Sequence, residues 1–214
     1  MDIDGISPRM LESGFYNMDC MDGMAQFPDK FFELAIVDPP YGVSIENSGT
    51  YFRQFSNKGW DVKPPDEEYF AELRRVSVNQ IIWGGNYFLE YLGNTKCFVI
   101  WDKLMGEGMS FADAELAWTS LNKPTRIKRM VSRSEGKIHP TQKPIALYKW
   151  LLSNYAKPGD KILDTHVGSA SSLIACHQMG FEYWGFELDA DYYKAATERL
   201  NRVKAQIDIF EAAE

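Results

Sequence analysis

The chain has 214 residues, and its 45% hydrophobic and 25% charged residues are the proportions of a globular protein with a buried core. Its apolar runs are shorter than a membrane span, its opening MDIDGISPRM is too polar for a signal peptide, and its three cysteines form no C-x-x-C pair. These features exclude a membrane protein, a disulfide scaffold and a cysteine-rich zinc site, and they predict a single cytoplasmic domain over residues 1–214 without a metal.

The net charge of −7, taken alone, argues against a nucleic-acid partner. The distribution of charge indicates otherwise. Seven lysines and arginines lie between residues 123 and 143 against the single acid Glu135, so this window carries +6 and the rest of the chain −13. By itself such a run also fits a solvated loop.

Short apolar runs typical of strands recur along the chain, at residues 14–19, 34–38, 80–83, 97–101, 115–119, 161–164 and 183–187. Most are too continuous to alternate, as in strands buried on both faces of a sheet. Between them lie three helical patterns. Two start at the N-cap residues Asp66 and Asp189, and one starts at Pro144, which suits a first helical turn. This alternation predicts an α/β fold on a mostly parallel sheet, whose ligands bind beyond the carboxyl ends of the strands.

The run that ends in IVDPPYG, residues 36–42, stops in an unusual way. Prolines cannot donate to a sheet ladder, so the chain has to leave the sheet at Asp38. The motif therefore holds a carboxylate stiffly beside the ring of Tyr41, at the strand end where a ligand is expected.

A second pattern near the C-terminus is typical of a nucleoside site. After the run at 161–164, the small residues Gly168, Ser169 and Ala170 permit a ligand to approach the backbone at the start of a helix. Nineteen residues after Gly168 the next run ends in Glu187, which is placed to accept hydrogen bonds from ribose hydroxyls. With one glycine in the turn, this is not the dinucleotide fingerprint, and a packing turn with a surface glutamate is the alternative.

The first run leads to a third piece, Asp19 and Cys20. A carboxylate at this strand end can accept from an adenine amino group while a neighbouring backbone N–H donates to the ring. The alternative is that Asp19 caps the turn that follows at 22–24.

Together these motifs resemble the S-adenosylmethionine-dependent amino-methyltransferases of DNA. The resemblance rests on the DPPY box at 38–41, the H-P-T-x-K-P box at 139–144, the glycine-bearing cofactor motif at 163–172 and the ribose-binding strand end at 186–189. Their order matches the circularly permuted β group. The resemblance implies a Rossmann-like seven-stranded, mostly parallel sheet with helices on both faces, and methylation of DNA as in restriction–modification.

The resemblance also assigns residues. It implies catalytic roles for Asp38, Pro39, Pro40 and Tyr41, and S-adenosylmethionine binding by Asp19, Cys20, Thr141, Lys143, Asp164, His166, Gly168, Ser169 and Glu187. Two departures stand out. The usual D-P-F-x-G-S-G-T-T reads DTHVGSASS at 164–172, with His166 as a polar intruder, and a basic loop at 123–138 stands in place of a full target-recognition domain.

In this chemistry the Asp38 carboxylate and the Pro39 carbonyl each accept one hydrogen of a base amino group, which aims the nitrogen lone pair at the sulfonium methyl. Tyr41 provides a stacking face for a base flipped out of its duplex. Aspartate at the first position of the box resembles enzymes specific for adenine N6. Methylation of cytosine N4, methylation of another nucleic acid or a free nucleotide, and a catalytically weakened relative that binds cofactor and DNA remain the alternatives.

Phosphate contacts need local positive charge and not a positive total. We therefore expect the basic window to line the path of double-stranded DNA as a flexible loop, through Lys123, Arg126, Lys128, Arg129, Arg133 and Lys137. Because a loop this short can contact few bases, we expect the DNA target sequence to be short or degenerate unless a homodimer supplies a second subunit.

Overall fold

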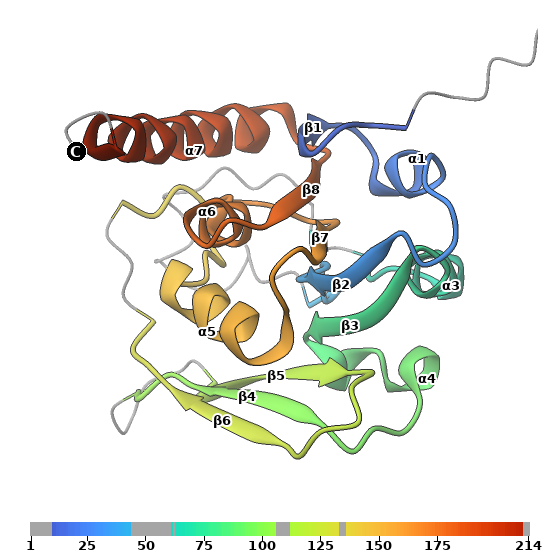
Figure 1. Ribbon diagram of the computed structural model, residues 1–214. Helices are drawn as coiled ribbons and strands as arrows, with labels where there is room; N and C mark the ends of the chain where they lie inside the picture. The colour runs from blue at the N-terminus through green and yellow to red at the C-terminus, as the bar shows by residue number, and fades with distance from the viewer. Residues whose placement is uncertain (1–9, 44–60, 62, 106–111, 133–135, 212–214) are drawn as a thin grey trace, which may run out of the picture.

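The computed structural model describes residues 10–43, 61, 63–105, 112–132 and 136–211, and its centre is one sheet (Figure 1). Across the sheet the strands follow the order β1-β8-β7-β2-β3-β5-β4-β6. In chain order they are β1 (Gly14–Asn17), β2 (Phe32–Val37), β3 (Ser77–Trp83), β4 (Phe98–Asp102), β5 (Ala114–Thr119), β6 (Arg126–Arg129), β7 (Lys161–Asp164) and β8 (Glu182–Glu187). All neighbours pair in parallel except β5, which is antiparallel to β3 and β4.

The predicted α/β fold with a mostly parallel sheet is confirmed, and each of the seven expected strands is present. The sheet has an eighth strand, β6, so the expected number of seven is wrong by one. Residues 126–129, expected within a flexible loop, pair in parallel with β4, with Ile100 opposite Ile127. An edge strand pairs on one side only, and its side chains can stay solvated, so four residues of which three are charged can form it.

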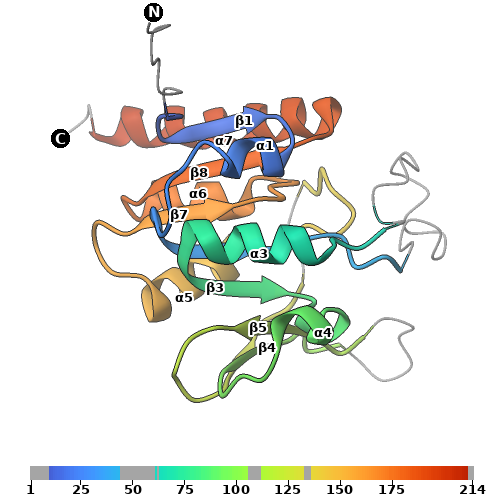
Figure 2. The same cartoon turned by 90° about the vertical axis from the view of Figure 1, so that its right-hand side faces the viewer.

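Helices cover both faces of the sheet (Figures 1 and 2). On one face lie α1 (Cys20–Met24), α3 (Glu67–Val76) and the short α4 (Leu89–Leu92), and on the other α5 (Ile145–Tyr155), α6 (Ser171–Gln178) and α7 (Ala190–Glu211). Within the described residues, no helix combines the length and the apolar character that crossing a membrane requires.

The central strand β2 shows why both faces are covered. Leu34 and Ile36 belong to the core that packs against α5, α6 and α7, whereas Ala35 and Val37 belong to the core on the opposite face. Successive side chains of a strand point to opposite faces, so a continuous apolar run needs two layers of helices to bury it.

Two of the predicted helix starts are capped as the sequence indicates. A carboxylate oxygen of Asp66 accepts a hydrogen bond from Tyr69 N at 3.2 Å, and Asp189 accepts from Tyr192 N at 2.9 Å. The last helix thereby starts directly after β8, and its first residues lie beside the carboxyl end of that strand.

Candidate active site

A cavity of about 600 Å³ lies at the carboxyl ends of the parallel strands. It brings together residues that the sequence assigned to two separate boxes and to the cofactor motif. Among its lining residues are Asp19, Cys20, Asp38, Pro40, Thr141, Lys143, His166, Gly168, Ser169 and Glu187. The other three expected site residues, Pro39, Tyr41 and Asp164, do not line it.

One wall of the cavity is the turn between β7 and α6. Gly168 N donates to Glu187 Oε2 at 2.8 Å, and Asp189 N donates to Oε1 at 2.9 Å. Gly168 has a φ of +55° and Ala170 a φ of +61°, so the backbone turns sharply twice before the helix starts. A non-glycine residue in this region is strained, and such strain clusters at functional sites. Glu187 is held by two backbone N–H groups and retains lone pairs for a ligand.

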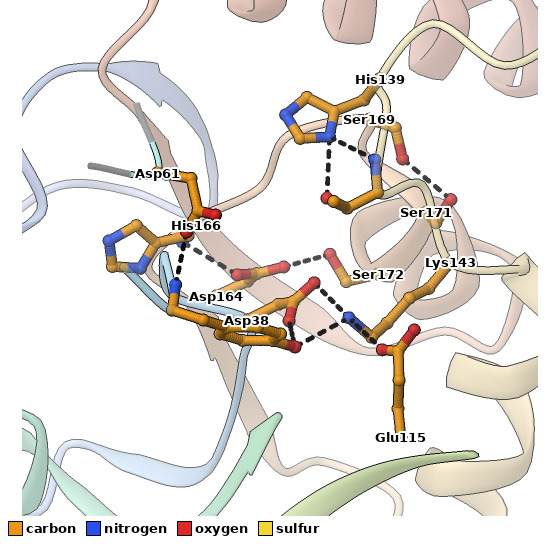
Figure 3. Close-up of polar contacts among 12 residues, drawn as sticks. Asp38, Asp61, Glu115, His139, Lys143, Asp164, His166, Ser169, Ser171 and Ser172 are labelled. Atoms are coloured by element: carbon orange, nitrogen blue, oxygen red, sulfur yellow. Dashed lines mark hydrogen bonds and ion pairs between the residues drawn. The ribbon is translucent and has the colours of Figure 1, made fainter. Parts of the chain in front are cut away.

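Asp164 lies under this turn. Its carboxylate accepts hydrogen bonds from His166 N at 3.0 Å and from the Ser172 hydroxyl (Figure 3). Burial raises the pKa of Asp164 to about 7, against the opposing effect of these two hydrogen bonds. The side chain therefore connects the end of β7 to the first turn of α6.

Two altered residues of the cofactor motif, Thr165 and His166, make polar contacts. The hydroxyl groups of Tyr69 and Thr165 are 2.7 Å apart, and Thr165 Oγ1 lies 2.9 Å from His166 Nδ1. Burial lowers the pKa of His166 to about 4, so the ring is neutral near pH 7. His166 thus adds no charge to the cavity wall.

Asp19 serves as the cap that the alternative interpretation predicted. Its Oδ1 accepts from Met21 N at 2.7 Å at the start of α1. The side chain also lines the cavity, so the cap does not remove it from the site. Next to it, burial and then the Asp19 charge raise the pKa of the Cys20 thiol to about 12, which keeps the sulfur protonated.

A chain of charged side chains starts at Asp38, which lines the cavity (Figure 3). Its Oδ1 accepts from the Tyr41 hydroxyl at 2.6 Å, and its Oδ2 pairs with the Lys143 ammonium. Lys143 Nζ also lies 3.1 Å from Glu115 Oε2, and Glu115 Oε1 lies 2.7 Å from Lys103 Nζ. Negative and positive groups therefore alternate from Asp38 to Lys103.

The pKa values in this chain follow from burial and pairing. Burial raises the pKa of Asp38, and the attraction of Lys143 opposes that rise without cancelling it. Burial acts in the same direction on Glu115, but Lys143 and Lys103 outweigh it and lower the pKa of that carboxyl. Burial lowers the pKa of Lys143, whereas Asp38 and Glu115 more than compensate and raise it. Lys143 is thus a stable buried cation.

The DPPY box is fixed by its surroundings. Asp61 Oδ1 accepts from the backbone N–H groups of Tyr41 and Gly42 at 2.7 and 3.0 Å. The Tyr41 ring stacks on Tyr87, with centroids 5.0 Å apart and planes inclined by 18°, and it packs against Gly84. One face of the ring is therefore covered by a second tyrosine, so a stacking role toward a base stays a prediction.

Three members of this arrangement were missed from the sequence: Glu115, Lys103 and Asp61. Glu115 has a signal in the sequence, because it is the one charged residue of the strand AELAWT. For Asp61 the sequence has no comparable signal, since neither a strand pattern nor a helix pattern includes it.

Three cations of the basic window contact neighbouring groups of the molecule. Lys123 donates to the Asn154 carbonyl at 2.8 Å and lies over the Tyr155 ring, and Lys128 lies 5.9 Å from the centroid of Trp150, both on α5. Arg129 pairs with Asp102 at 3.2 Å at an exposed site. Arg133 lies outside the described residues.

Comparison with known proteins decides the family. Residues 82–198, more than half of the chain, match the model of the N6/N4 DNA methyltransferases, described as DNA methylase. The chain belongs to this family. It is therefore a DNA methyltransferase of the N6-adenine or N4-cytosine type that uses S-adenosylmethionine, and the family resemblance and the cofactor expected from the sequence are confirmed.

Curated relatives agree with this assignment. The methyltransferase is 24% identical over 209 residues to YubD of Escherichia coli (strain K12), which carries the name of a methylase, with 90% of this chain and 92% of that protein aligned. It is 26% identical over 161 residues to the type II methyltransferase M2.DpnII of Streptococcus pneumoniae, with 74% of this chain aligned to 54% of that protein.

Solved structures share the fold of the methyltransferase. The M1.HpyAVI complex with S-adenosylmethionine superposes with a TM-score of 0.62 at 19% identity, covering 87% of this chain and 98% of that one. The cytosine-N4-specific PvuII DNA methyltransferase superposes with a TM-score of 0.62 at 12% identity, covering 92% and 93% of the two chains.

Proposed function

We propose that this methyltransferase transfers a methyl group from S-adenosylmethionine to the exocyclic N6 amino group of adenine in a base flipped out of double-stranded DNA. The observation that carries the proposal is that Asp38 lines the same cavity as Gly168 and Glu187. A hydrogen-bond acceptor for a base amino group thus lies next to a pocket suited to a nucleoside.

The cavity fits the cofactor in size and in donor set. Its volume of about 600 Å³ is within the usual range for small-molecule sites. Glu187 has lone pairs for ribose hydroxyls, Asp19 offers a carboxylate to the adenine amino group, and the lining also includes the hydroxyl residues Ser169 and Thr141. When bound, S-adenosylmethionine supplies an electrophilic methyl group on a sulfonium sulfur.

The residues of the DPPY box act on the amino group of the base. An exocyclic amine is a poor nucleophile because its lone pair is delocalised into the ring. Hydrogen bonds to Asp38 and to the Pro39 carbonyl draw the nitrogen toward tetrahedral geometry. The oriented lone pair would then take the methyl group that the bound cofactor supplies, its carbon–sulfur electron pair staying on sulfur, and Asp38 would stabilise the positive charge on the nitrogen until one amino hydrogen passes to water as a proton.

Adenine is favoured over cytosine by the first residue of the box. Aspartate in this position resembles the adenine-N6 enzymes, whereas serine is commoner in the cytosine-N4 enzymes. A catalytically weakened relative is disfavoured by the intact box, in which both oxygens of Asp38 are engaged and the backbone of Tyr41 is held by Asp61.

For the DNA path we retain the basic window, now divided between strand β6 and its flanks. Arg126 and Arg129 are exposed on β6, so they are the members of the set that are best placed to contact phosphates. Lys123 and Lys128 also contact α5, through the rings of Tyr155 and Trp150. A homodimer that adds a second set of contacts stays a prediction.

The experiment is incubation of unmethylated DNA with isotope-labelled cofactor, followed by mass spectrometry of the nucleosides. We expect label in N6-methyladenine for the wild type and none for Asp38→Ala, with cofactor affinity retained in the variant. Label in N4-methylcytosine would overturn the choice of base. Label in neither nucleoside, with cofactor bound normally, would identify the chain as a binding relative.

A further inference from the structure

Lys143 belongs to the box that the sequence assigns to the cofactor, but its ammonium faces the carboxylate of the DPPY box. Its side chain is 3% exposed. The ammonium pairs with Asp38 and Glu115 and lies 3.4 Å from the Tyr41 hydroxyl, so its three hydrogens have three oxygen partners. It also lies over the Trp83 ring, 5.2 Å from the centroid.

The charge count explains why such a lysine is needed. Asp38 is 16% exposed and has a second carboxylate, Glu115, close by. Two carboxylates in a poorly solvated site do not both stay ionised without a cation, because burial and like charge each favour the protonated form. Lys143 between them, with Lys103 on the far side of Glu115, makes the four groups neutral in sum.

The geometry leaves room for the base. One oxygen of Asp38 accepts from Tyr41 and the other from Lys143. An ionised carboxylate has about four lone-pair positions, so acceptor capacity for an amino hydrogen remains. A protonated Asp38 would lose part of that capacity and the negative charge that stabilises the developing cation on the nitrogen.

We propose that Lys143 is a positioning residue that keeps Asp38 ionised and fixes the direction of its free lone pairs, and that Glu115 and Lys103 hold Lys143 in place. The catalytic consequence rests on the proposed function of Asp38. The ionisation itself does not, and it can be measured without turnover.

Other titratable groups around Asp38 have to be considered, because any of them could dominate its ionisation. They come from each element packed against it: Tyr41 in the box, Tyr69 on α3, Glu115 on β5, Lys143 before α5, Tyr148 on α5 and Asp164 on β7. Within this set Lys143 is the cation. Removal of Lys143 and removal of Glu115 should therefore shift the pKa of Asp38 in opposite directions.

The test is nuclear magnetic resonance of the full chain with ¹³C-carboxyl-labelled aspartate, in which the Asp38 signal is identified by its loss in Asp38→Asn. Lys143→Met should raise the midpoint of the Asp38 titration by about one to three pH units, and Glu115→Gln should lower it. Lys143→Arg keeps the charge and should stay within half a unit of the wild type. The matched control is Lys161→Met, which removes a lysine paired with Glu33 at 3.9 Å on another edge of the molecule.

Calorimetry with S-adenosylmethionine separates this role from the one implied by the family resemblance. We expect Lys143→Met to bind the cofactor within about threefold of the wild type. An Asp38 midpoint that does not move in Lys143→Met or Glu115→Gln would overturn the proposal. If cofactor affinity also falls tenfold or more while the midpoint stays unmoved, the ammonium of Lys143 contacts the cofactor instead.

A third measurement links ionisation to turnover. If the wild type methylates DNA, the acid limb of the single-turnover rate should shift with the midpoint, upward in Lys143→Met and downward in Glu115→Gln. If the wild type methylates nothing, the proposed function fails, and the resonance midpoints still decide whether Lys143 controls Asp38. The two failures are thereby distinguishable.

Discussion

Gly84 allows a single methyl group to test how closely the DPPY box has to be held. Its φ is +68°, and a Cβ added there would lie 2.5 Å from Cδ1 of the Tyr41 ring and closer still to Cε1. Ordinary contacts start at 3.4 Å. Gly84→Ala therefore displaces the ring by about 1 Å or more, away from the position in which its hydroxyl donates to Asp38.

The expected size of the effect follows from that displacement. A misplacement of about 1 Å in a catalytic group can cost on the order of 100-fold in rate. Alanine in a left-handed conformation also costs about 1 kcal/mol of folding stability, whatever its surroundings. Gly180→Ala supplies the control, because Gly180 has a φ of +73° and no atom within 4 Å of the added Cβ.

The assay is the single-turnover rate on DNA, with stability followed by denaturant unfolding and cofactor affinity by calorimetry. Both variants should lose comparable backbone stability and retain cofactor binding, and only Gly84→Ala should lose about 100-fold in rate. If the rates of the two variants agree within threefold, the position of Tyr41 does not control the chemistry and our account of the box is wrong.

Three further predictions address the cofactor, the pH dependence and the DNA. Glu187→Ala should weaken cofactor binding by about 1–3 kcal/mol in calorimetry, and unchanged binding would contradict the ribose role. Burial, reinforced by Lys143, lowers the pKa of His139 to about 3, so the unfolded chain takes up this proton while the folded chain resists it. Relative to His139→Gln, wild-type unfolding free energy should therefore fall by about 1.4 kcal/mol between pH 7.5 and 5.5, and parallel curves would refute this. Neutralising Arg126 and Arg129 together should lower the salt slope of DNA binding by about two, whereas Arg202→Ala on α7 should leave it unchanged, and equal slopes would remove β6 from the DNA path.

Much of the fold could be predicted because the strands that form its centre are buried on both faces. Runs such as LAIV, residues 34–37, are apolar throughout, and the caps Asp66 and Asp189 mark the starts of their helices. Strand β6 could not be predicted in this way. Hydrophobic periodicity arises where side chains are buried, and an edge strand with solvated side chains shows little periodicity. Its partner on β4 lies almost thirty residues earlier in the chain.

The site was predictable where it depends on strand ends. Parallel strands bring their carboxyl ends to one edge of the sheet, so Asp38 and Glu187 had to lie near each other once the strands were recognised. Glu115 is near the amino end of its strand, which would place it at the opposite edge if that strand were parallel. Because β5 is antiparallel to β3, its first residues instead lie beside the carboxyl end of β3, next to Lys143. Strand direction cannot be read from an apolar run.

The pairing of β1 with β8 has a consequence for how the molecule is assembled. Asn17 donates to the Glu187 carbonyl at 2.7 Å, a contact that joins residues 170 positions apart. On a ribosome, β1 is made before β8, its one partner among the described strands, so the cavity walls that contain Asp19 and Glu187 come together only when β8 has emerged. Because contacts so distant in sequence form slowly, backbone amides of β1 should gain protection from hydrogen exchange together with those of β8 and later than those of β2 and β3.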